Sequence, residues 1–464
     1  MRFRSFRGGV HPGQAKGATC GRPIAELPLP AQVVIPLTQH LGSPNEPVIA
    51  VGDTVRVGQK IGDTKAFVAA PVHASVSGRV TAIEPRPLAA GGSSLAVVIE
   101  RDGDERLADL GPVGKAGEMS PADLRRAMRD AGLVGMGGAG FPTHVKYSPP
   151  DGKRIEAVIL NAAECEPFLT CDHRLLLEET GLVLEGFLAM MRAAGAERAY
   201  IGIEDNKADA IEALEKEIKR AGYPMQVAVV PAKYPQGEER LLIKAILGRE
   251  VPSGGLPVDV GVVVNNVATA AAMATYLRTG MPLVARVMTV TGQVAQPENL
   301  RVRIGTLLTE VIAACGGVLG EPGRLIYGGP MTGPAGFRLD VPVVKAMSGL
   351  LVQGKAEARV AREMACIRCG RCLEACPYGM VPGMVAGFAE LGQFDKAAAI
   401  GLLDCRECGS CTFVCPSRRP LSQRIKEAKL VVMNQRKKEA AKKAESQAQT
   451  ATMGYEQGSI AQGR

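Results

Sequence analysis

Short runs of aliphatic residues recur in the middle of the chain, each ending in polar residues and each followed by a helix-like stretch. The runs lie at residues 157–160, 199–203, 227–230 and 262–264. This alternation predicts an α/β domain with a parallel sheet. Ligands bind such sheets beyond the carboxyl ends of the strands, so the polar residues after the runs are candidates for a binding site.

A helix and then a glycine-rich loop precede the first run. Ser120 and Asp123 have capping-box spacing, and Pro121 suits a first helical turn. Apolar positions recur at helical spacing at Leu124, Ala127, Met128 and Ala131. The glycines that follow let backbone N–H groups approach a phosphate. Because a helix rather than a strand precedes them, an ordinary dinucleotide-binding Rossmann site is disfavoured.

The flanking segments have other patterns. Residues 51–83 read as short strands and turns, similar to a biotinyl- or lipoyl-type half-barrel. The stretch 282–344 combines a strand-like run at 284–291 with a helix-like run at 307–315. Residues 433–464 have too little apolar content to fold alone, which predicts a disordered basic tail. The fold class is therefore multidomain α/β and α+β.

Eight of the twelve cysteines form two runs with one spacing, Cys-x2-Cys-x2-Cys-x3-Cys-Pro. In this pattern three thiolates of a run bind one [4Fe–4S] cluster and the fourth binds the other cluster. The predicted ligands of the first cluster are Cys366, Cys369, Cys372 and Cys415, and those of the second are Cys376, Cys405, Cys408 and Cys411. Structural zinc is the alternative, but zinc prefers two separated pairs of ligands.

The composition of the chain disfavours some classes of function. The chain is 46% hydrophobic and 22% charged, as globular proteins are, and it lacks Trp, which disfavours a nucleic-acid stacking platform. Two clusters would offset part of the net charge of +8. We expect no membrane-spanning helix and no signal peptide, and hence a cytoplasmic location. The remaining cysteines, Cys20, Cys165, Cys171 and Cys315, lack ligand spacing and are interpreted as small hydrophobic residues.

Several motifs resemble the FMN- and NADH-binding flavoprotein subunit of complex I. They are Gly135 to Lys146, Asn161-Ala-Ala-Glu164-Cys-Glu166, Gly237-Glu-Glu239 and Asn265-Asn266-Val-Ala-Thr269. Together with Gly8-Gly-Val-His-Pro12 and the cysteine runs, the pattern is similar over nearly the whole chain to the RnfC (RsxC) family, which belongs to the Rnf (Rsx) electron transport complexes. The resemblance implies a barrel-sandwich hybrid domain at 1–105, an FMN/NADH-binding α/β domain at 115–280, a β-grasp (SLBB-like) domain at 281–350 and a ferredoxin-like domain with two [4Fe–4S] clusters at 355–432.

The resemblance also implies a flavin site. FMN would be held by Gly135, Gly137, Gly138, Gly140, Lys146, Asn161, Glu164, Gly237, Glu239, Asn265, Asn266 and Thr269. The implied catalytic residues, which would line the nicotinamide pocket, are Phe141, Lys146, Glu166 and Glu238. Ala163 stands where the complex I protein has an Asp, so a flavin hydrogen bond made there does not carry over.

The implied function is electron transfer from NADH through FMN and the clusters to partner subunits, coupled to ion translocation. A flavin suits this step because it accepts a hydride and releases single electrons. The resemblance implies a peripheral subunit on the cytoplasmic side of the inner membrane. Its partners would be ferredoxin-like and membrane-embedded subunits, with ferredoxin or flavodoxin as an indirect acceptor. The alternatives are a cobalamin reductase of propanediol-utilising compartments and an adaptor that holds clusters without binding NADH.

Overall fold

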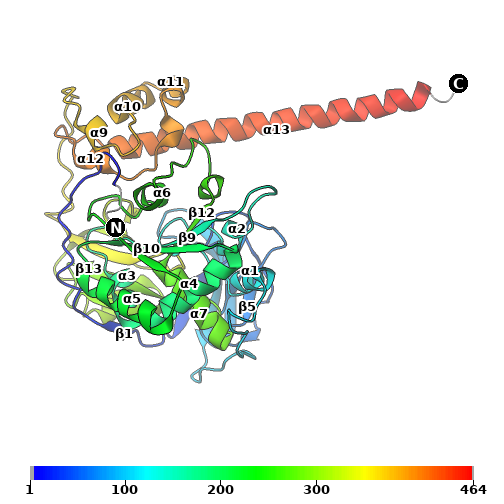
Figure 1. The fold of residues 1–464 in the computed structure, drawn as a ribbon, viewed down its shortest axis with the longest axis vertical. Helices are drawn as coiled ribbons and strands as arrows, with labels where there is room; N and C mark the ends of the chain where they lie inside the picture. The colour runs from blue at the N-terminus through cyan, green and yellow to red at the C-terminus, as the bar shows by residue number, and fades with distance from the viewer. Residues whose placement is uncertain (1–4, 462–464) are drawn as a thin grey trace. The chain divides into compact units, whose positions relative to one another are not determined.

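The computed structural model describes the backbone of residues 5–461 and the side chains of residues 5–440 and 442. The chain forms two compact units. One contains residues 5, 6 and 11–360, and the other contains residues 7–10 and 361–461. Figure 1 shows sheets and helices in the first unit and short helices beside the long helix α13 (Leu421–Ala461) in the second.

The middle of the chain folds as the predicted α/β domain. Its strands are β9 (Ala157–Ala162), β10 (Arg198–Glu204), β11 (Gln226–Val230) and β12 (Val262–Asn266), which are parallel and lie in the order β11-β10-β9-β12. Each predicted run is therefore confirmed as a strand. The register pairs Asn161 with Gly202 on one side and with Asn266 on the other. The carboxyl ends of the strands consequently meet at one edge of the sheet.

Helices cover both faces of this sheet. Val158 and Leu160 share a core with α4 (Thr180–Ala194), α5 (Ala208–Ala221) and α7 (Val267–Thr279), while Ile159 packs on the other side with α6 (Glu239–Leu247). Figure 1 shows α4 and α7 side by side on one side of the sheet and α6 on the other. A Cβ at Gly186 would lie only 1.8 Å from the Ala270 carbonyl oxygen, so glycine is what allows α4 and α7 to pack this closely.

Helix α1 (Pro121–Asp130) begins where the sequence predicts. The Asp123 N–H donates to the Ser120 hydroxyl oxygen at 3.1 Å, and the Ser120 hydroxyl donates to the Asp123 carboxylate at 2.7 Å. All four predicted inward-facing residues are buried. Gly132, with a φ of 66°, then turns the chain out of the helix toward the glycine-rich loop, a conformation that suits glycine.

Two small sheets share the apolar core of the N-terminal domain, as the half-barrel prediction requires. The first contains β2 (Gln32–Pro36), β8 (Ser93–Arg101), β7 (Gly78–Pro87) and β4 (Thr54–Val55), in that order. The second contains β3 (Glu46–Pro47), β5 (Lys60–Asp63) and β6 (Val72–His73). Ile35, Ile61 and Ile99 are fully buried in this core.

The β-grasp domain differs in two respects from its predicted extent of 281–350, because its last strand ends at Gly354 and its sheet includes a strand from the start of the chain. Its sheet contains β13 (Ala285–Gly292), β14 (Glu298–Arg303), β15 (Pro322–Tyr327), β16 (Ala335–Gly336) and β17 (Gly349–Gly354), with helix α8 (Leu308–Ala314) packed against it. Strand β1 (Ile24–Glu26) joins this sheet beside β14, although the sequence assigned residues 24–26 to the N-terminal domain. A three-residue strand has no periodicity of its own, and its long-range pairing decides where it lies.

The second unit consists of short helices against the start of α13. These are α9 (Arg371–Ala375), α10 (Pro382–Glu390), α11 (Phe394–Ala399) and α12 (Ser410–Phe413), and their shared core includes Val385, Leu402 and Ile425.

The prediction of a disordered tail at 433–464 needs correction over the described residues. Helix α13 continues to Ala461, because Ala, Lys, Glu and Gln are strong helix formers. Val432 is the last buried side chain of α13 among those described. Within residues 5–461, no helix is long and apolar enough to cross a lipid bilayer.

Candidate functional site

The predicted flavin residues meet at the carboxyl edge of the parallel sheet. Asn161, near the end of β9, donates from Nδ2 to the Gly237 carbonyl at 2.7 Å and accepts from the Ala163 N–H at 3.2 Å. Gly237 passes so near that a Cβ on it would lie 2.4 Å from the Ala163 oxygen. The loop after β9 and the loop before α6 are therefore joined at this edge.

The residues that follow β12 connect the sheet to the glycine-rich loop. Asn266 caps α7 by accepting from the Ala268 N–H at 2.9 Å and donates to Asp172 at 2.6 Å. Thr269 accepts from the Met136 N–H at 3.1 Å and donates to the Val134 carbonyl at 3.0 Å. Thr269 is fully buried, so its contribution is to hold the loop in place.

The glycine-rich loop presents its backbone at the surface. Val134 and Pro142 pair across its base, and the Gly135 N–H donates to the Phe141 carbonyl at 2.9 Å. Residues 137–139 at its tip are exposed. Gly140 has a φ of 66°, and a Cβ on Gly137 would lie 2.7 Å from the Asn266 amide nitrogen. The loop combines open backbone N–H groups with close approach to Asn266.

Lys146 places a cation at the same edge. It ends α2 (Thr143–Lys146), and its ammonium donates to the Val264 carbonyl at 3.1 Å and lies 3.6 Å from Glu239. Asn265, also on β12, donates its side-chain amide to the buried Tyr147 hydroxyl. Phe141 is half-buried at the base of the loop.

Glu164 lies in a buried group of charges. Its Oε1 accepts from the Asp172 N–H, at the start of α3 (Cys171–Glu178), at 2.9 Å. Lys16, from the N-terminal segment, donates to the Glu164 carbonyl and lies 3.9 Å from its Oε2. Both side chains are nearly inaccessible to water. Burial, reinforced by the neighbouring Glu164 charge, raises the pKa of Asp172 to about 7.

Sequence reasoning missed part of this group. Burial also raises the pKa of Glu204 to about 7, and the Lys16 ammonium opposes that rise. Asp172 had one available signal, since it follows the Asn-Ala-Ala-Glu-Cys-Glu motif closely. No sequence signal pointed to Lys16, because its contact with Glu164 joins residues 148 positions apart.

Two predicted catalytic carboxylates, Glu238 and Glu166, accept hydrogen bonds from nearby groups of the protein. Glu238 caps α6, accepting from the N–H groups of Arg240 and Leu241 at 3.0 Å each. Glu166 accepts from the Met331 N–H at 2.9 Å and from the Thr332 hydroxyl in the β-grasp domain, and burial raises its pKa. Glu166 is thus tied to a turn of the β-grasp domain.

The site fits a bound flavin nucleotide. Among the described residues, Glu164 Oε2 and both amide atoms of Gln236 are buried without a hydrogen-bond partner, and they lie on the two loops that Asn161 joins. Buried polar atoms need partners, which a polar ligand would supply. The exposed loop backbone and Lys146 would suit the phosphate of FMN.

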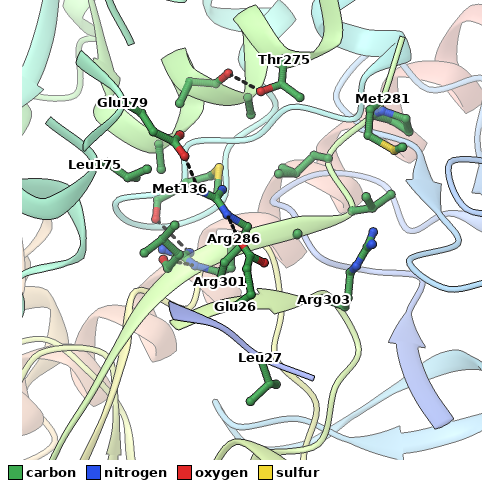
Figure 2. Close-up of a pocket in the computed structure, with 18 of the residues that line it drawn as sticks. Glu26, Leu27, Met136, Leu175, Glu179, Thr275, Met281, Arg286, Arg301 and Arg303 are labelled. Atoms are coloured by element: carbon green, nitrogen blue, oxygen red, sulfur yellow. Dashed lines mark hydrogen bonds and ion pairs between the residues drawn. The ribbon is translucent and has the colours of Figure 1, made fainter. Parts of the chain in front are cut away.

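A cleft of about 540 Å³ lies behind the loop, between α7 and the strands β13 and β14. Figure 2 shows Arg286 close to Met136 and Arg301 in this cleft. The buried Arg286 guanidinium donates to the Lys345 carbonyl at 2.6 Å and approaches the Met136 carbonyl at 3.4 Å. None of the predicted flavin residues lines this cleft, and Arg286 supports the loop from the side of Met136.

The two cysteine runs have matching backbone angles at two equivalent positions. Arg368 and Glu407, at equivalent positions, have φ values of 54° and 57°, and Gly370 and Gly409 have 79° and 78°. Positive φ is uncommon for residues other than glycine, so the agreement marks a shared loop shape. Helices α9 and α12 begin directly after these glycines.

Cys376 lies with the cysteines of the other run. One cavity is lined by the four cysteines predicted for the second cluster, Cys376, Cys405, Cys408 and Cys411. Burial raises the pKa of the Cys376, Cys405 and Cys411 thiols. Four cysteines around one cavity suit an iron–sulfur cluster, whose positive irons favour thiolates.

The first predicted set of ligands has different contacts. The Arg419 guanidinium lies beside Cys366, and a Cβ on Gly383 would contact the Cys372 sulfur. In the described part of the chain, no three or more His, Cys, Asp or Glu side chains are arranged for a single metal ion. The assignment of Cys366, Cys369, Cys372 and Cys415 stays a prediction from their spacing.

Four protein-family models match the chain. They are an RnfC barrel sandwich hybrid domain at 4–104, a Nuo51 FMN-binding domain at 128–275, an SLBB domain at 287–335 and a 4Fe-4S dicluster domain at 365–419. The predicted fold class and the predicted cofactors, FMN and two [4Fe–4S] clusters, are confirmed.

The chain also matches curated proteins over most of its length. The RnfC component of the Na⁺-translocating ferredoxin:NAD⁺ oxidoreductase complex of Acetobacterium woodii is 44% identical over 94% of this chain and 99% of its own. The counterpart from the proton-translocating complex of Clostridium ljungdahlii is 45% identical over 85% and 86%. The counterpart from the ion-translocating oxidoreductase complex of Rhodobacter capsulatus is 41% identical over 86% and 78%. The chain therefore belongs to the RnfC family of the ion-translocating ferredoxin:NAD⁺ oxidoreductase (Rnf) complexes.

Proposed function

We propose that this chain is the NADH-oxidising subunit of a membrane-bound, ion-translocating ferredoxin:NAD⁺ oxidoreductase complex. It carries electrons between NADH, FMN and two [4Fe–4S] clusters and exchanges them with partner subunits. The observation that carries the proposal is the pairing, in one chain, of an FMN-binding α/β domain and a dicluster domain. Membership of the complex would hold it at the cytoplasmic side of the membrane.

Different residues at the sheet edge would bind different parts of FMN and NADH. The exposed backbone of the loop tip and the Lys146 ammonium would hold the phosphate of FMN. Glu164 and Gln236 offer buried polar atoms to the rest of the nucleotide. FMN, when bound, supplies the exchange between a two-electron hydride and single electrons. Phe141 and Glu238, beside the same loops, would orient the nicotinamide.

The cysteine runs would pass single electrons onward. Cys376 lies among the cysteines of the other run, so the second cluster would take its ligands from both runs. A fold that links the two sites in this way keeps them close together, and a pair of clusters suits transfer of one electron at a time.

An anaerobic NADH titration of the purified, FMN-loaded full-length chain tests the function. NADH should bleach the flavin absorbance and then give the EPR signals of reduced clusters. Unchanged flavin with clusters that dithionite still reduces would contradict NADH oxidation and favour the adaptor.

The cobalamin reductase alternative is disfavoured by the family match over nearly the whole chain. Cob(II)alamin offered to the NADH-reduced protein provides a direct check. We expect no reduction above the rate with free FMN, and rapid reduction would overturn the assignment to the Rnf-type activity.

A further inference from the structure

The Gly8-Gly9 pair belongs to the unit that holds the cysteine runs. Residues 7–10 group with residues 361–461, although more than 350 positions separate them from that segment. The Gly9 N–H donates to the Ala375 carbonyl at 2.9 Å, and Val10 is buried. Residues 7–10 are therefore docked on the turn at the end of α9, which contains the predicted ligand Cys376.

Gly8 approaches this turn more closely than any other residue type could. A Cβ on Gly8 would lie 2.9 Å from both the carbonyl carbon and the oxygen of Cys376, and 3.1 Å from the Ala375 oxygen. These contacts are with backbone, which cannot rotate away as a flexible side chain can. Gly8 also has a φ of 74°, where a side chain adds strain.

The contact of Gly8 affects Cys376, a predicted ligand of the second cluster. The N–H groups of Tyr378, Gly379 and Met380 lie within hydrogen-bond reach of the Cys376 sulfur. Hydrogen bonds to cluster sulfurs are one of the factors that set the reduction potential of an iron–sulfur centre. The position of the Cys376 backbone therefore controls how well these donors reach the sulfur.

We propose that Gly8 and Gly9 are positioning residues for the second cluster, holding the Cys376 backbone where its sulfur joins Cys405, Cys408 and Cys411 and receives the N–H groups that follow it. This inference rests on the proposed function only in taking that cluster as present. It assigns a structural role to Gly8 and Gly9, which at the level of sequence are only part of a family motif.

Gly8→Ala in the full-length, cluster-loaded protein tests the proposal, with Gly13→Ala as the matched control. Gly13 lies a few residues after Gly8 along the chain, and a Cβ there would meet nothing within 4 Å. Iron and sulfide content, cluster EPR and potentiometric titration are measured for both. In Gly8→Ala one cluster should lose occupancy or titrate at a more negative potential, because weaker donors stabilise the reduced form less. The other cluster and the FMN content should not change.

The affected signal is identified by comparison with Cys376→Ala, which should alter the same cluster. Gly8→Asn separates strain from collision, because Asn tolerates positive φ yet still carries a Cβ, and it should reproduce the shift. The proposal is overturned if Gly8→Ala behaves like Gly13→Ala, if it alters the cluster that Cys376→Ala leaves intact, or if it removes FMN and both clusters together. A chain that lacks iron in every variant would contradict the proposed function instead.

Discussion

Lys16 shows how one residue far from the motifs completes the candidate site. Its ammonium is the cation closest to the Glu164 carboxylate, and the two side chains are 7% and 6% exposed. A buried carboxylate without its cation is strongly destabilising. Lys16 thus belongs to the site as a counter-charge, although it lies in the N-terminal segment.

We predict that Lys16→Met lowers the free energy of unfolding by about 3 kcal/mol and weakens FMN binding. Glu164 would be left buried and unpaired. Chemical denaturation and the FMN content of the purified protein measure the two effects. Lys115→Met is the control, since the Lys115 side chain is 86% exposed. Equal behaviour of the two variants would refute the counter-charge role.

Asp172 gives the stability of the site a pH dependence. Its folded-state pKa of about 7 lies above the unfolded value, so the folded chain binds this proton more tightly. The resulting stability is full below about pH 4, falls as the pH rises toward 7 and is absent above that.

Asp172→Asn should remove this dependence while still accepting from Asn266. We expect the wild-type free energy of unfolding to fall relative to the variant by about 1 kcal/mol per pH unit between pH 5 and pH 7. Urea unfolding of flavin-free protein at several pH values measures the difference. The raised pKa of Glu204 contributes equally to both proteins, so its contribution cancels in the difference between them. Parallel curves for the two proteins would show that the raised pKa is wrong.

At the scale of elements, the glycine-rich loop depends on contact with the start of α7. Gly137 lies against the Asn266 amide, which also caps α7 and binds Asp172. One glycine therefore links the loop, a helix N-terminus and the buried charges.

Gly137→Ala should lower the melting temperature of flavin-free protein by several degrees, because its Cβ would displace Asn266 from these bonds. Gly138→Ala is the neighbouring control, since a Cβ at Gly138 meets nothing within 4 Å. Differential scanning calorimetry compares the two. A larger loss in Gly138→Ala would contradict the packing described for the loop.

The parts of the site that could be predicted are those with local patterns. The strand ends at Asn161 and Asn266 follow from short apolar runs, because parallel strands bring polar residues after them to one edge. The bonds of Glu166 to a turn of the β-grasp domain could not be foreseen, since no local signal indicates which domain a side chain contacts. The same holds for β1, whose partner strand lies far along the chain.

At the scale of the whole molecule, the chain joins a nucleotide-binding fold to a pair of cysteine runs that are predicted to exchange one cluster ligand. Cys376 comes from the first run but lines a cavity with three cysteines of the second. With this exchange, each cluster would depend on both runs.

Cys376→Ala should therefore disturb the same EPR signal as Cys405→Ala and leave the signal that Cys369→Ala disturbs. The reason is that Cys376 and Cys405 would bind one cluster. Low-temperature EPR of the dithionite-reduced variants, with iron analysis, makes the comparison. Agreement of Cys376→Ala with Cys369→Ala would instead show that each run binds its own cluster.

Metal analysis of anaerobically purified, full-length protein tests the central claim most directly, because electron transfer requires both clusters. We predict about eight iron and eight acid-labile sulfide per chain, the content of two [4Fe–4S] centres. Zinc in place of iron, or iron without sulfide, would contradict the account.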